Sequence, residues 1–327
     1  MILVKIDKGV MYESNLPYPV VRGKVRDNYD ISELMGFPTL LIVATDRVSA
    51  FDVVSGDPIQ YKGVVLTQMT LFWLEYLNFS NHLLTATIDY YPKELQKYRD
   101  QLMGRSMIVR IFNIFPLECI VRGYLTGSGK EDYDEIGKVD WHELPKWLVE
   151  ASEIDPPIFT PSTKAEIGKH DKNIYMRDDA VSILVTHFSK KDFACSKKAA
   201  SDLLEELEEI SIYLYSKAAV YAENRGIIIA DTKFELAYNV TFGGSGFILC
   251  DEVLTPDSSR FWSKDQYKEG VTQPSFDKQY VRDYLKSLGW SKKSGIPMPK
   301  LPEDVKEKTT EKYIQAYEML TGKKFNF

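Results

Sequence analysis

The chain has 327 residues, of which 44% are apolar and 27% are charged, a globular composition with enough material for one large domain or two modest ones. The formal net charge of −6 disfavours a dedicated nucleic-acid-binding protein, because such proteins are usually basic. No apolar run approaches the roughly 18 residues that span a bilayer, and the three cysteines show neither metal nor disulfide spacing, so we expect a cytoplasmic protein without a nucleic-acid or membrane partner.

The first third of the chain reads mostly as β-structure. Residues 18–30 predict two strands joined by a tight turn, for which Gly23 supplies the conformational freedom. A continuous apolar run opens residues 39–54 and predicts a buried strand that passes into polar residues. Residues 62–77 change to helical periodicity, and residues 106–125 return to strand chemistry, interrupted once by a proline.

The second half of the chain is richer in helix. Residues 143–173 are rich in Pro, Ser, Thr and charge, and we interpret them as a long loop. Residues 196–226 carry an apolar stripe at helical spacing and end at a glycine that suits a helix C-terminus. A hairpin and two terminal helices complete the chain, with strands expected at 227–238 and 246–252 and helices near 276–288 and 304–321.

The strand predicted at 227–238 carries the charges Asp231, Lys233 and Glu235 at alternate positions. Because side chains of a strand alternate between its faces, these three project together, and burying them unpaired would cost several kcal/mol. One explanation without a function is that Lys233 forms structural ion pairs with its two neighbouring carboxylates. Asp251 ends the partner strand, so Glu235 and Asp251 are candidates to hold one Mg²⁺ ion, which typically takes one or two protein carboxylates. Two carboxylates beside a lysine fit a site for a metal–nucleotide.

The predicted turn at Gly23 is flanked by Lys24 and Arg26, and phosphate oxygens favour such cations together with backbone N–H groups. An ordinary basic surface turn is the alternative, and the Walker A pattern is not present. Residues 45–52 follow a buried strand and carry polar side chains, which often point into a cleft.

Arg122 ends an apolar strand and is followed by a glycine-rich turn that contains Ser128. A guanidinium beside hydroxyl groups suits a phosphate monoester, and Arg260 is a candidate second arginine. A surface arginine on an ordinary turn is the alternative. Residues 161–173 mix hydroxyls, cations and acids as a substrate-binding loop does, although a solvated linker has the same composition.

Together these stretches resemble the SAICAR synthetase family of purine biosynthesis. Residues 115–129 and 229–236 are similar to its two signatures. Further family blocks follow in family order at 23–30, 45–52, 159–166, 251–262 and 275–285. One departure is Leu236-Ala237, where the family usually has Phe-Gly. The charged face of the strand is intact, so we expect activity to be retained and only the local shape of the cleft to differ.

The resemblance implies a two-lobed α+β fold related in outline to protein kinases, with lobes at residues 1–114 and 115–327 and ATP between them beneath the glycine turn. It implies an enzyme, monomeric or a small homo-oligomer, that joins L-aspartate to the carboxylate of CAIR (carboxyaminoimidazole ribonucleotide). The reaction would use MgATP, give SAICAR, ADP and phosphate, and pass through an acyl phosphate.

The resemblance also implies roles for single residues. Lys233 and Asp231 would be catalytic, with Lys233 neutralising the transferred group and Asp231 accepting hydrogen bonds from the ribose of CAIR. ATP and its Mg²⁺ would be bound by Gly23, Lys24, Arg26, Glu235 and Asp251, the last two being the metal ligands. CAIR would contact Asp46, Ser49, Arg122, Ser128 and Arg260. The candidates for the carboxylates of L-aspartate are Lys164 and Lys268.

Two other functions compete with this interpretation. A small-molecule kinase, such as an inositol-phosphate kinase, would share the Asp-x-Lys strand but fits residues 122–128 and 161–166 poorly. A catalytically silent nucleotide-binding regulatory protein would have lost one of Lys233, Glu235 and Asp251, and the chain retains all three.

Overall fold

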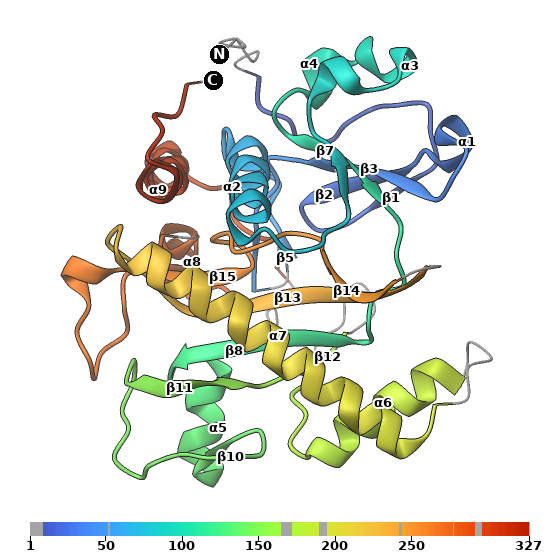
Figure 1. Cartoon of the computed structure of the whole chain (residues 1–327). Helices are drawn as coiled ribbons and strands as arrows, with labels where there is room; N and C mark the ends of the chain where they lie inside the picture. Colours follow the sequence, from blue (N-terminus) through green and yellow to red (C-terminus); the bar gives the residue numbers. More distant parts are fainter. Residues whose placement is uncertain are drawn as a thin grey trace.

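The computed structural model of the chain describes residues 9–51, 53–164, 172–189, 195–241, 244–276, 278–291 and 296–326, with the backbone alone at 240, 241, 244 and 245. The fold is α+β, as the sequence predicts. Two sheets lie one above the other in Figure 1, and the helices surround them. The strands within both sheets pair antiparallel.

The first sheet is built from the N-terminal third of the chain, in the order β1-β2-β3-β7-β6. Its central strand β3 (Thr39–Ala44) is the predicted apolar run and is buried along most of its length. The predicted hairpin at 18–30 is confirmed, because β1 and β2 pair with Arg22 opposite Asp27. The remaining strands of this sheet are β1 (Val20–Arg22), β2 (Arg26–Asp30), β6 (Leu83–Thr85) and β7 (Ser106–Arg110).

The second sheet has the order β11-β8-β13-β14, with β12 beside β8 and β15 beside β13. β13 (Ile227–Thr241) pairs with three strands, namely β8 (Leu117–Tyr124), β14 (Gly244–Cys250) and β15 (Ser259–Ser263). This confirms the predicted hairpin, of which turn residues 242–243 lie outside the described part. Short ribbons complete the β-structure: β4 (Ser49–Ala50), β5 (Val53–Val54), β9 (Lys138–Val139) and β10 (His142–Glu143).

The interpretation of residues 143–173 as one long loop was wrong in part. β11 (Glu153–Phe159) and β12 (Ser162–Thr163) both pair with β8. β11 contains two prolines, and its register shifts between Glu153 and Ile158. Proline has no N–H to donate, so it is tolerated on an edge strand such as β11, where composition alone disguises the strand. Residues 165–171 of the predicted substrate loop lie outside the described residues.

The long predicted helices are confirmed as α2 (Lys62–Leu77), α7 (Lys197–Glu223), α8 (Gln279–Ser287) and α9 (Glu303–Thr321). α7 runs diagonally across the second sheet (Figure 1), and its apolar stripe, including Leu207 and Leu214, packs against Phe234 of β13. The remaining helical segments are α1 (Ser32–Met35), α3 (Lys93–Gln96), α4 (Arg99–Leu102), α5 (Ser128–Ile136), α6 (Arg177–Ser189), η1 (Ile88–Tyr90) and η2 (Lys264–Gln266).

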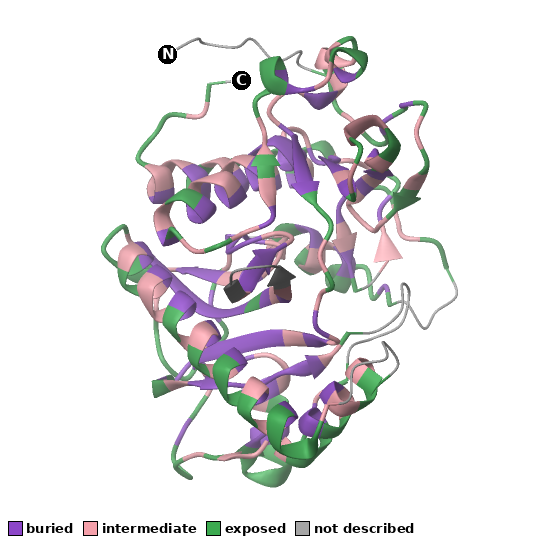
Figure 2. Cartoon of the chain, turned by 45° about the vertical axis from the view of Figure 1, so that its right-hand side comes forward, coloured by how far each residue is buried: buried purple, intermediate pink, exposed green. Residues whose placement is uncertain are grey.

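The predicted lobe boundary at residue 114 falls between the two sheets. The helices do not follow that division, because α9 packs beside α2 in Figure 1 and both contribute to the core beneath α7. Val281 and Leu285 of α8 likewise pack with Val48 and Ile59 from the N-terminal part. Buried residues gather in the sheets and on the inner faces of the helices (Figure 2). The C-terminal helices therefore join the two parts, and the two-lobe division stays a prediction.

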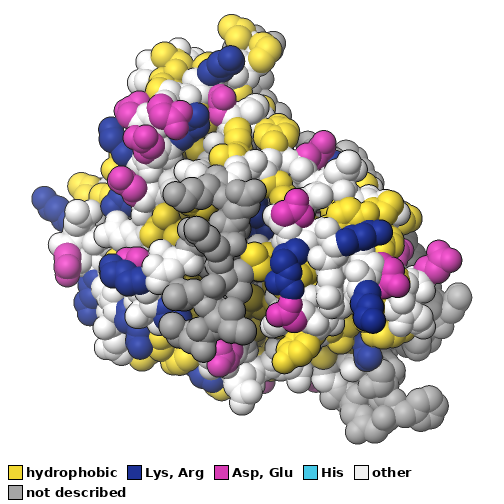
Figure 3. All heavy atoms as spheres, turned by 90° about the horizontal axis from the view of Figure 1, so that it is seen from above, with side chains coloured by type: hydrophobic (Ala, Val, Ile, Leu, Met, Phe, Trp, Pro, Cys, Tyr) yellow, Lys and Arg dark blue, Asp and Glu magenta, His cyan; other side chains and the backbone are white. Residues whose placement is uncertain are grey.

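The described surface carries charges of both signs. On the face seen in Figure 3, Lys and Arg side chains are interspersed with Asp and Glu side chains outside the grey region. A membrane span would need a long apolar helix, and none of the helices within the described ranges meets that requirement.

Candidate active site

The charged strand β13 changes face part-way along its length. Its pairing with β15 shifts register between Ile229 and Asp231, which is a β-bulge, and the Ile229 carbonyl accepts a 2.6 Å hydrogen bond from the Tyr215 hydroxyl of α7. Before the bulge Ile229 packs in the main core, whereas after it Phe234 does. The expected unbroken alternation was therefore wrong. The bulge turns Asp231 away from α7, and bulges are frequent beside active sites.

Asp231 lies between two arginines. Arg122 of β8 is directly opposite it, and Arg122 Nη1 is 3.0 Å from Asp231 Oδ2, which Arg260 of β15 also contacts. Arg122 also donates from Nε to Thr160 Oγ1 at 3.0 Å and from Nη2 to Ser128 Oγ at 3.1 Å. The predicted residues Arg122, Ser128, Asp231 and Arg260 thus form one cluster. Two guanidinium groups share one carboxylate, and a guanidinium pair of this kind suits an anionic ligand, although Asp132 and Asp140 also attract Arg122.

The glycine-rich turn before α5 lies against these arginines. Gly127 has φ of +58°, a conformation that side chains other than glycine rarely adopt, and a Cβ built on it would overlap the guanidinium of Arg260. A Cβ on Gly129 would lie 3.2 Å from Cδ and Nε of Arg122. The turn needs glycine so that its backbone can approach both arginines closely.

Glu235 and Asp251 lie at the other end of the charged face. Glu235 pairs with Cys250, which places it beside Asp251. Each carboxylate already faces a cation: Lys164 Nζ is 2.5 Å from Glu235 Oε2, and Arg26 contacts Asp251 through a two-bond fork with Nη2–Oδ2 at 2.6 Å. The structure therefore brings together the predicted metal ligands, one predicted ATP residue and one predicted aspartate residue.

The two carboxylates differ in their protonation. Burial and the negative charge of Asp251 raise the pKa of Glu235 to about 7, although Lys164 opposes this shift. Burial also acts to raise the pKa of Asp251, but the Arg26 guanidinium outweighs it and holds that pKa below its usual value. Adjacent carboxylates that repel one another are a hard-oxygen donor set, and they fit Mg²⁺ when the ion's remaining ligands are water and phosphate. Nowhere in the described ranges do three or more His, Cys, Asp or Glu side chains gather as a metal-binding group.

Lys233 is exposed on β13 between these two groups, and its backbone N–H donates to the Ser258 carbonyl at 3.1 Å. It projects from the same charged stretch as Asp231 and Glu235. Three residues of strand separate those two carboxylates, a span of about 13 Å along the backbone.

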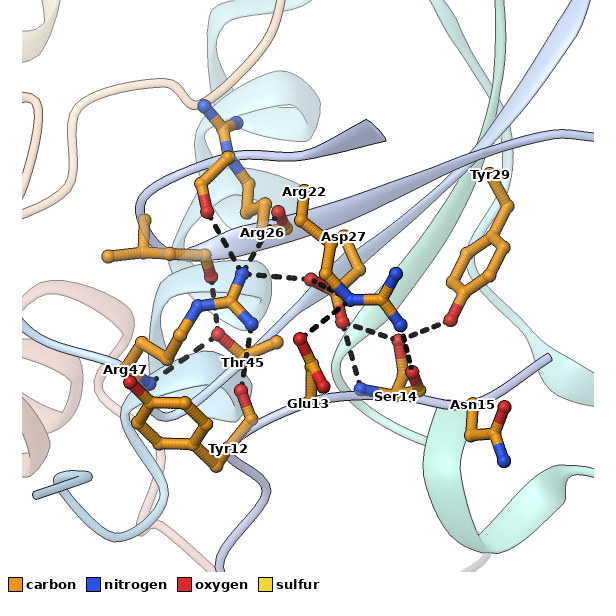
Figure 4. A network of polar contacts seen from close by, with 12 residues as sticks. Tyr12, Glu13, Ser14, Asn15, Arg22, Arg26, Asp27, Tyr29, Thr45 and Arg47 are labelled. Carbon is orange, nitrogen blue, oxygen red and sulfur yellow. Dashed lines mark hydrogen bonds and ion pairs between the residues drawn. The ribbon is translucent and has the colours of Figure 1, made fainter. Parts of the chain in front are cut away.

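The β1–β2 turn is held by an arginine that the sequence reasoning missed (Figure 4). Arg47 is buried and donates to the carbonyls of Gly23 at 3.1 Å, Lys24 at 3.2 Å and Arg26 at 3.2 Å, while its Nη2 is 2.8 Å from Asp27 Oδ1. Gly23 is not among the glycines with positive φ, so its conformational freedom is not what forms the turn. Arg47 fixes the turn instead, with Lys24 half-buried in it.

Three further predicted residues belong to other elements. Asp46 is fully buried, where it accepts from the N–H groups of Met11 and Gly63 and pairs with Arg105, so its oxygens serve the fold. Ser49 is half-buried in the short strand β4. Lys268 is exposed and follows β15 beyond the Ile227 end of β13.

Lys164 and Lys268 are therefore not brought together. Lys164 pairs with Glu235, whereas the strand that leads to Lys268 ends opposite Ile227. These two positions on β13 are eight residues apart, or about 26 Å. Of the two candidates for the aspartate carboxylates, Lys164 is the one beside Glu235, and both assignments stay predictions.

Other contacting residues had no sequence signal. Glu118 lies 4.0 Å from Lys164, and Thr160 bonds Arg122. Both lie inside the family blocks described above, but only their contacts with Lys164 and Arg122 indicate a role.

The chain matches known proteins over almost its whole length. The family model described as SAICAR synthetase matches residues 19–297. A phosphoribosylaminoimidazole-succinocarboxamide synthase of Geobacter sulfurreducens is 47% identical over 92% of this chain and 94% of its own length, and one of Geotalea uraniireducens is 48% identical over the same shares. A SAICAR synthase from Saccharomyces cerevisiae, in complex with SAICAR, has 40% identity and a TM-score of 0.82, covering 97% of this chain and 100% of its own. The chain therefore belongs to the SAICAR synthetase family of enzymes.

Proposed function

We propose that this chain joins L-aspartate to the carboxylate of CAIR, forming SAICAR in purine biosynthesis, and that it uses MgATP to do so. The observation that carries the proposal is the arrangement of β13, with a pair of arginines at Asp231, a pair of carboxylates at Glu235 and exposed Lys233 between them. The yeast relative is complexed with SAICAR, the product that this reaction would make.

The chemistry explains why a phosphate donor is needed. A carboxylate is a poor acceptor for an amine, because its leaving group would be oxide. Phosphorylation by ATP converts it to an acyl phosphate, whose leaving group is phosphate. The amine of aspartate then attacks the acyl carbon and phosphate departs. Both steps favour a site that positions the reactants and limits water.

The residues take roles according to their charge. Arg122, Ser128 and Arg260 would bind the 5′-phosphate of CAIR, and Asp231 would orient the arginines and accept from the ribose. Lys233 would neutralise charge on the transferred phosphoryl group. Lys24 would lie over the ATP phosphates in the turn that Arg47 holds. Glu235 and Asp251 would hold Mg²⁺, which neutralises phosphate charge when bound.

Arg26 and Lys164 now contact the carboxylates proposed to hold the metal. When MgATP binds, each cation would be released toward a new anion. Arg26 would turn to the ATP phosphates, and Lys164 would become available to a carboxylate of L-aspartate. Lys268 follows β15, whose last residue lies opposite Ile227 at the far end of β13 from Glu235, and it would not share that role.

The test measures phosphate release by the purified protein with MgATP, L-aspartate and CAIR, omitting each in turn. Release that needs all three, with a product heavier by the mass of aspartate less water, supports the ligase. Release without aspartate would indicate a kinase. Nucleotide binding without any turnover would indicate a regulatory protein. Asp251→Asn should lower turnover at least about a hundredfold, whereas Asp265→Asn on exposed η2 is the matched control.

A further inference from the structure

Asp257 lies in the connection between β14 and β15, and three side chains from outside that connection contact its carboxylate. Lys62 Nζ is 2.6 Å from Oδ2, Lys278 Nζ is 3.1 Å from Oδ1, and the Tyr313 hydroxyl donates to Oδ1 at 2.6 Å. The side chain of Asp257 is only 9% exposed, and that of Lys62 is not exposed at all. A carboxylate at this depth needs paired charges, and these contacts supply them.

The partners of Asp257 come from helices that are far apart in the sequence. Lys62 is the first residue of α2, Lys278 immediately precedes α8, and Tyr313 lies within α9. α2 and α9 lie side by side in Figure 1, and α8 packs against α9. None of the ligand-binding roles proposed above falls on residues 279–326, so the C-terminal helices have no function assigned so far beyond packing.

The connection that contains Asp257 spans residues 251–258. It begins at Asp251 and leads into β15, whose second residue is Arg260, and both of these residues are proposed to bind ligands. Its backbone is strained, because Asp251 has φ of +61° and Leu254 has φ of +51°, and neither is glycine. Non-glycine residues keep this conformation only where the surroundings hold them in it. Inside the connection, the N–H groups of Ser258 and Ser259 both donate to the carbonyl of Thr255.

We propose that Lys278 and Tyr313 are positioning residues of this enzyme, which hold Asp257 so that the strained connection presents Asp251 and Arg260 in the geometry needed for the reaction. The inference rests on the proposed function, because it assigns the C-terminal helices a part in that same site. Neither residue is assigned a contact with a substrate.

The electrostatics of the cluster agree with this role. Burial opposes the ionisation of Asp257, but Lys278, Lys62 and the Tyr313 hydroxyl outweigh it and hold its pKa far below the usual value. Asp257 is therefore charged, and it keeps its attraction to both lysines across the working pH range. Because Lys278 and Tyr313 share Oδ1, each limits the movement of the same oxygen.

The experiment uses the full chain and the three-substrate phosphate-release assay. Tyr313→Phe removes only the hydroxyl, and Lys278→Gln removes the charge from a side chain that is 13% exposed. Tyr317→Phe is the matched control, because it makes the same change one turn further along α9, where the ring packs against Phe325. The KM values for CAIR and L-aspartate, kcat and the Mg²⁺ concentration for half-maximal rate are measured well below the melting temperature of each variant.

We expect kcat/KM for CAIR to fall roughly tenfold to a hundredfold in both variants, the order that a small misplacement of binding groups produces. The Mg²⁺ requirement should rise as well, whereas KM for L-aspartate should stay within twofold, because Lys164 lies outside the connection. The double variant should lose less than the product of the two single losses, because both act through one oxygen.

Two results would overturn the inference. One is that both single variants keep all kinetic constants within twofold of the unmodified chain. The other is that they lose stability alone, so that active-site titration accounts for the whole loss of rate. If Tyr313→Phe does not fold, Lys278→Gln decides alone. An unmodified chain without ligase activity would instead count against the proposed function.

Discussion

Arg26 and Asp251 connect the two sheets through a two-bond fork, with Nη2 2.6 Å from Oδ2 and Nη1 in contact with Oδ1. Arg26 comes from β2 of the first sheet, and Asp251 directly follows β14 of the second. The guanidinium thus occupies both oxygens of a carboxylate proposed to bind Mg²⁺. The Arg26 guanidinium and a metal ion cannot both bind fully to the same carboxylate lone pairs, so they must compete for Asp251.

We therefore expect Arg26→Gln to strengthen the binding of the metal and to weaken the binding of the nucleotide. Removing the competing guanidinium should tighten Mn²⁺ binding to the nucleotide-free protein several-fold, because Asp251 loses its paired cation and then repels Glu235 more strongly. KM for ATP should rise, because a phosphate contact is lost. Isothermal titration with Mn²⁺ checks the first effect. Weaker Mn²⁺ binding in the variant would show that the fork supports the metal site instead of blocking it.

Glu235 should make the stability of the protein depend on pH. Its pKa is about 7 in the folded chain, against an ordinary value of 4.5. Between these pH values the folded state keeps a proton that the unfolded state has lost, so the free energy of unfolding falls as pH rises from about 4.5 to 7. The full effect is at most about 3 kcal/mol. The Asp251 shift acts only below this window, because its pKa is lowered.

Urea unfolding at intervals between pH 5 and 8 measures this slope, with Glu235→Gln as the comparison. The variant has no proton to lose at this position, so its unfolding free energy should fall less with rising pH. Equal slopes for the two proteins would mean that Glu235 keeps an ordinary pKa beside Lys164.

Replacing Lys164 should change KM for L-aspartate far more than KM for ATP. Lys164→Gln is expected to raise KM for L-aspartate tenfold or more, as loss of a charge-assisted contact does, with KM for ATP changed far less. Lys172→Gln is the control, because this exposed lysine belongs to the segment whose backbone bonds Thr163. An unchanged aspartate KM would remove Lys164 from the site, and an effect of Lys268→Gln instead would place the aspartate at the other end of β13.

Gly127→Ala should disturb the arginine cluster by direct overlap. The new Cβ would collide with the guanidinium of Arg260, so KM for CAIR should rise tenfold or more. Gly137→Ala is the comparison, because Gly137 also has positive φ, +72°, but has nothing within 4 Å of a Cβ. Gly137→Ala should carry backbone strain of about 1 kcal/mol, measurable as a lower melting temperature. Gly127→Ala should carry more, because ψ of −138° at Gly127 lies outside the left-handed helical region that Gly137 occupies. Equal CAIR constants in the two variants would separate the Gly127 turn from CAIR binding.

Local patterns predicted most of the fold. Periods of two and 3.6 residues identified β13, α2 and α7, because side-chain burial imposes those periods on the sequence. The bulge at Asp231 was missed, because it depends on the Tyr215 hydroxyl from α7 and on the register of β15. β11 was missed because its prolines are tolerated only at a sheet edge, and an edge is a property of the assembled sheet.

The site was predicted where charges stand out within an apolar strand, as at Asp231 and Glu235. Residues that shape the site were missed where a charged side chain contacts a distant part of the chain. Arg47 and Asp46 are neighbours in sequence, yet Arg47 holds the β1–β2 turn while Asp46 pairs with Arg105. Asp257 has its role only because α2, α8 and α9 converge on it. Such contacts join residues more than 20 positions apart, so no local pattern records them.

Asp231→Asn should reveal the anion site through stability. Arg122 is buried, with a side chain only 5% exposed, and Asp231 is the carboxylate shared between it and Arg260. Neutralising that carboxylate removes the charge that both guanidinium groups contact, although Asp132 and Asp140 still attract Arg122, and should cost about 3 kcal/mol in the free energy of unfolding. The geometry of the cluster is otherwise kept, because Asn has the same size and can still accept a hydrogen bond.

An inorganic anion should restore part of that loss, because it can take the place of the missing charge and binds only the folded cluster. We expect millimolar phosphate to raise the melting temperature of Asp231→Asn more than that of the unmodified chain, at equal ionic strength in chloride. Asp265→Asn, on the exposed η2, controls for general effects of charge removal. If phosphate shifts all three proteins equally, Arg122 and Arg260 do not form an anion site, and the proposed position of the CAIR phosphate is wrong.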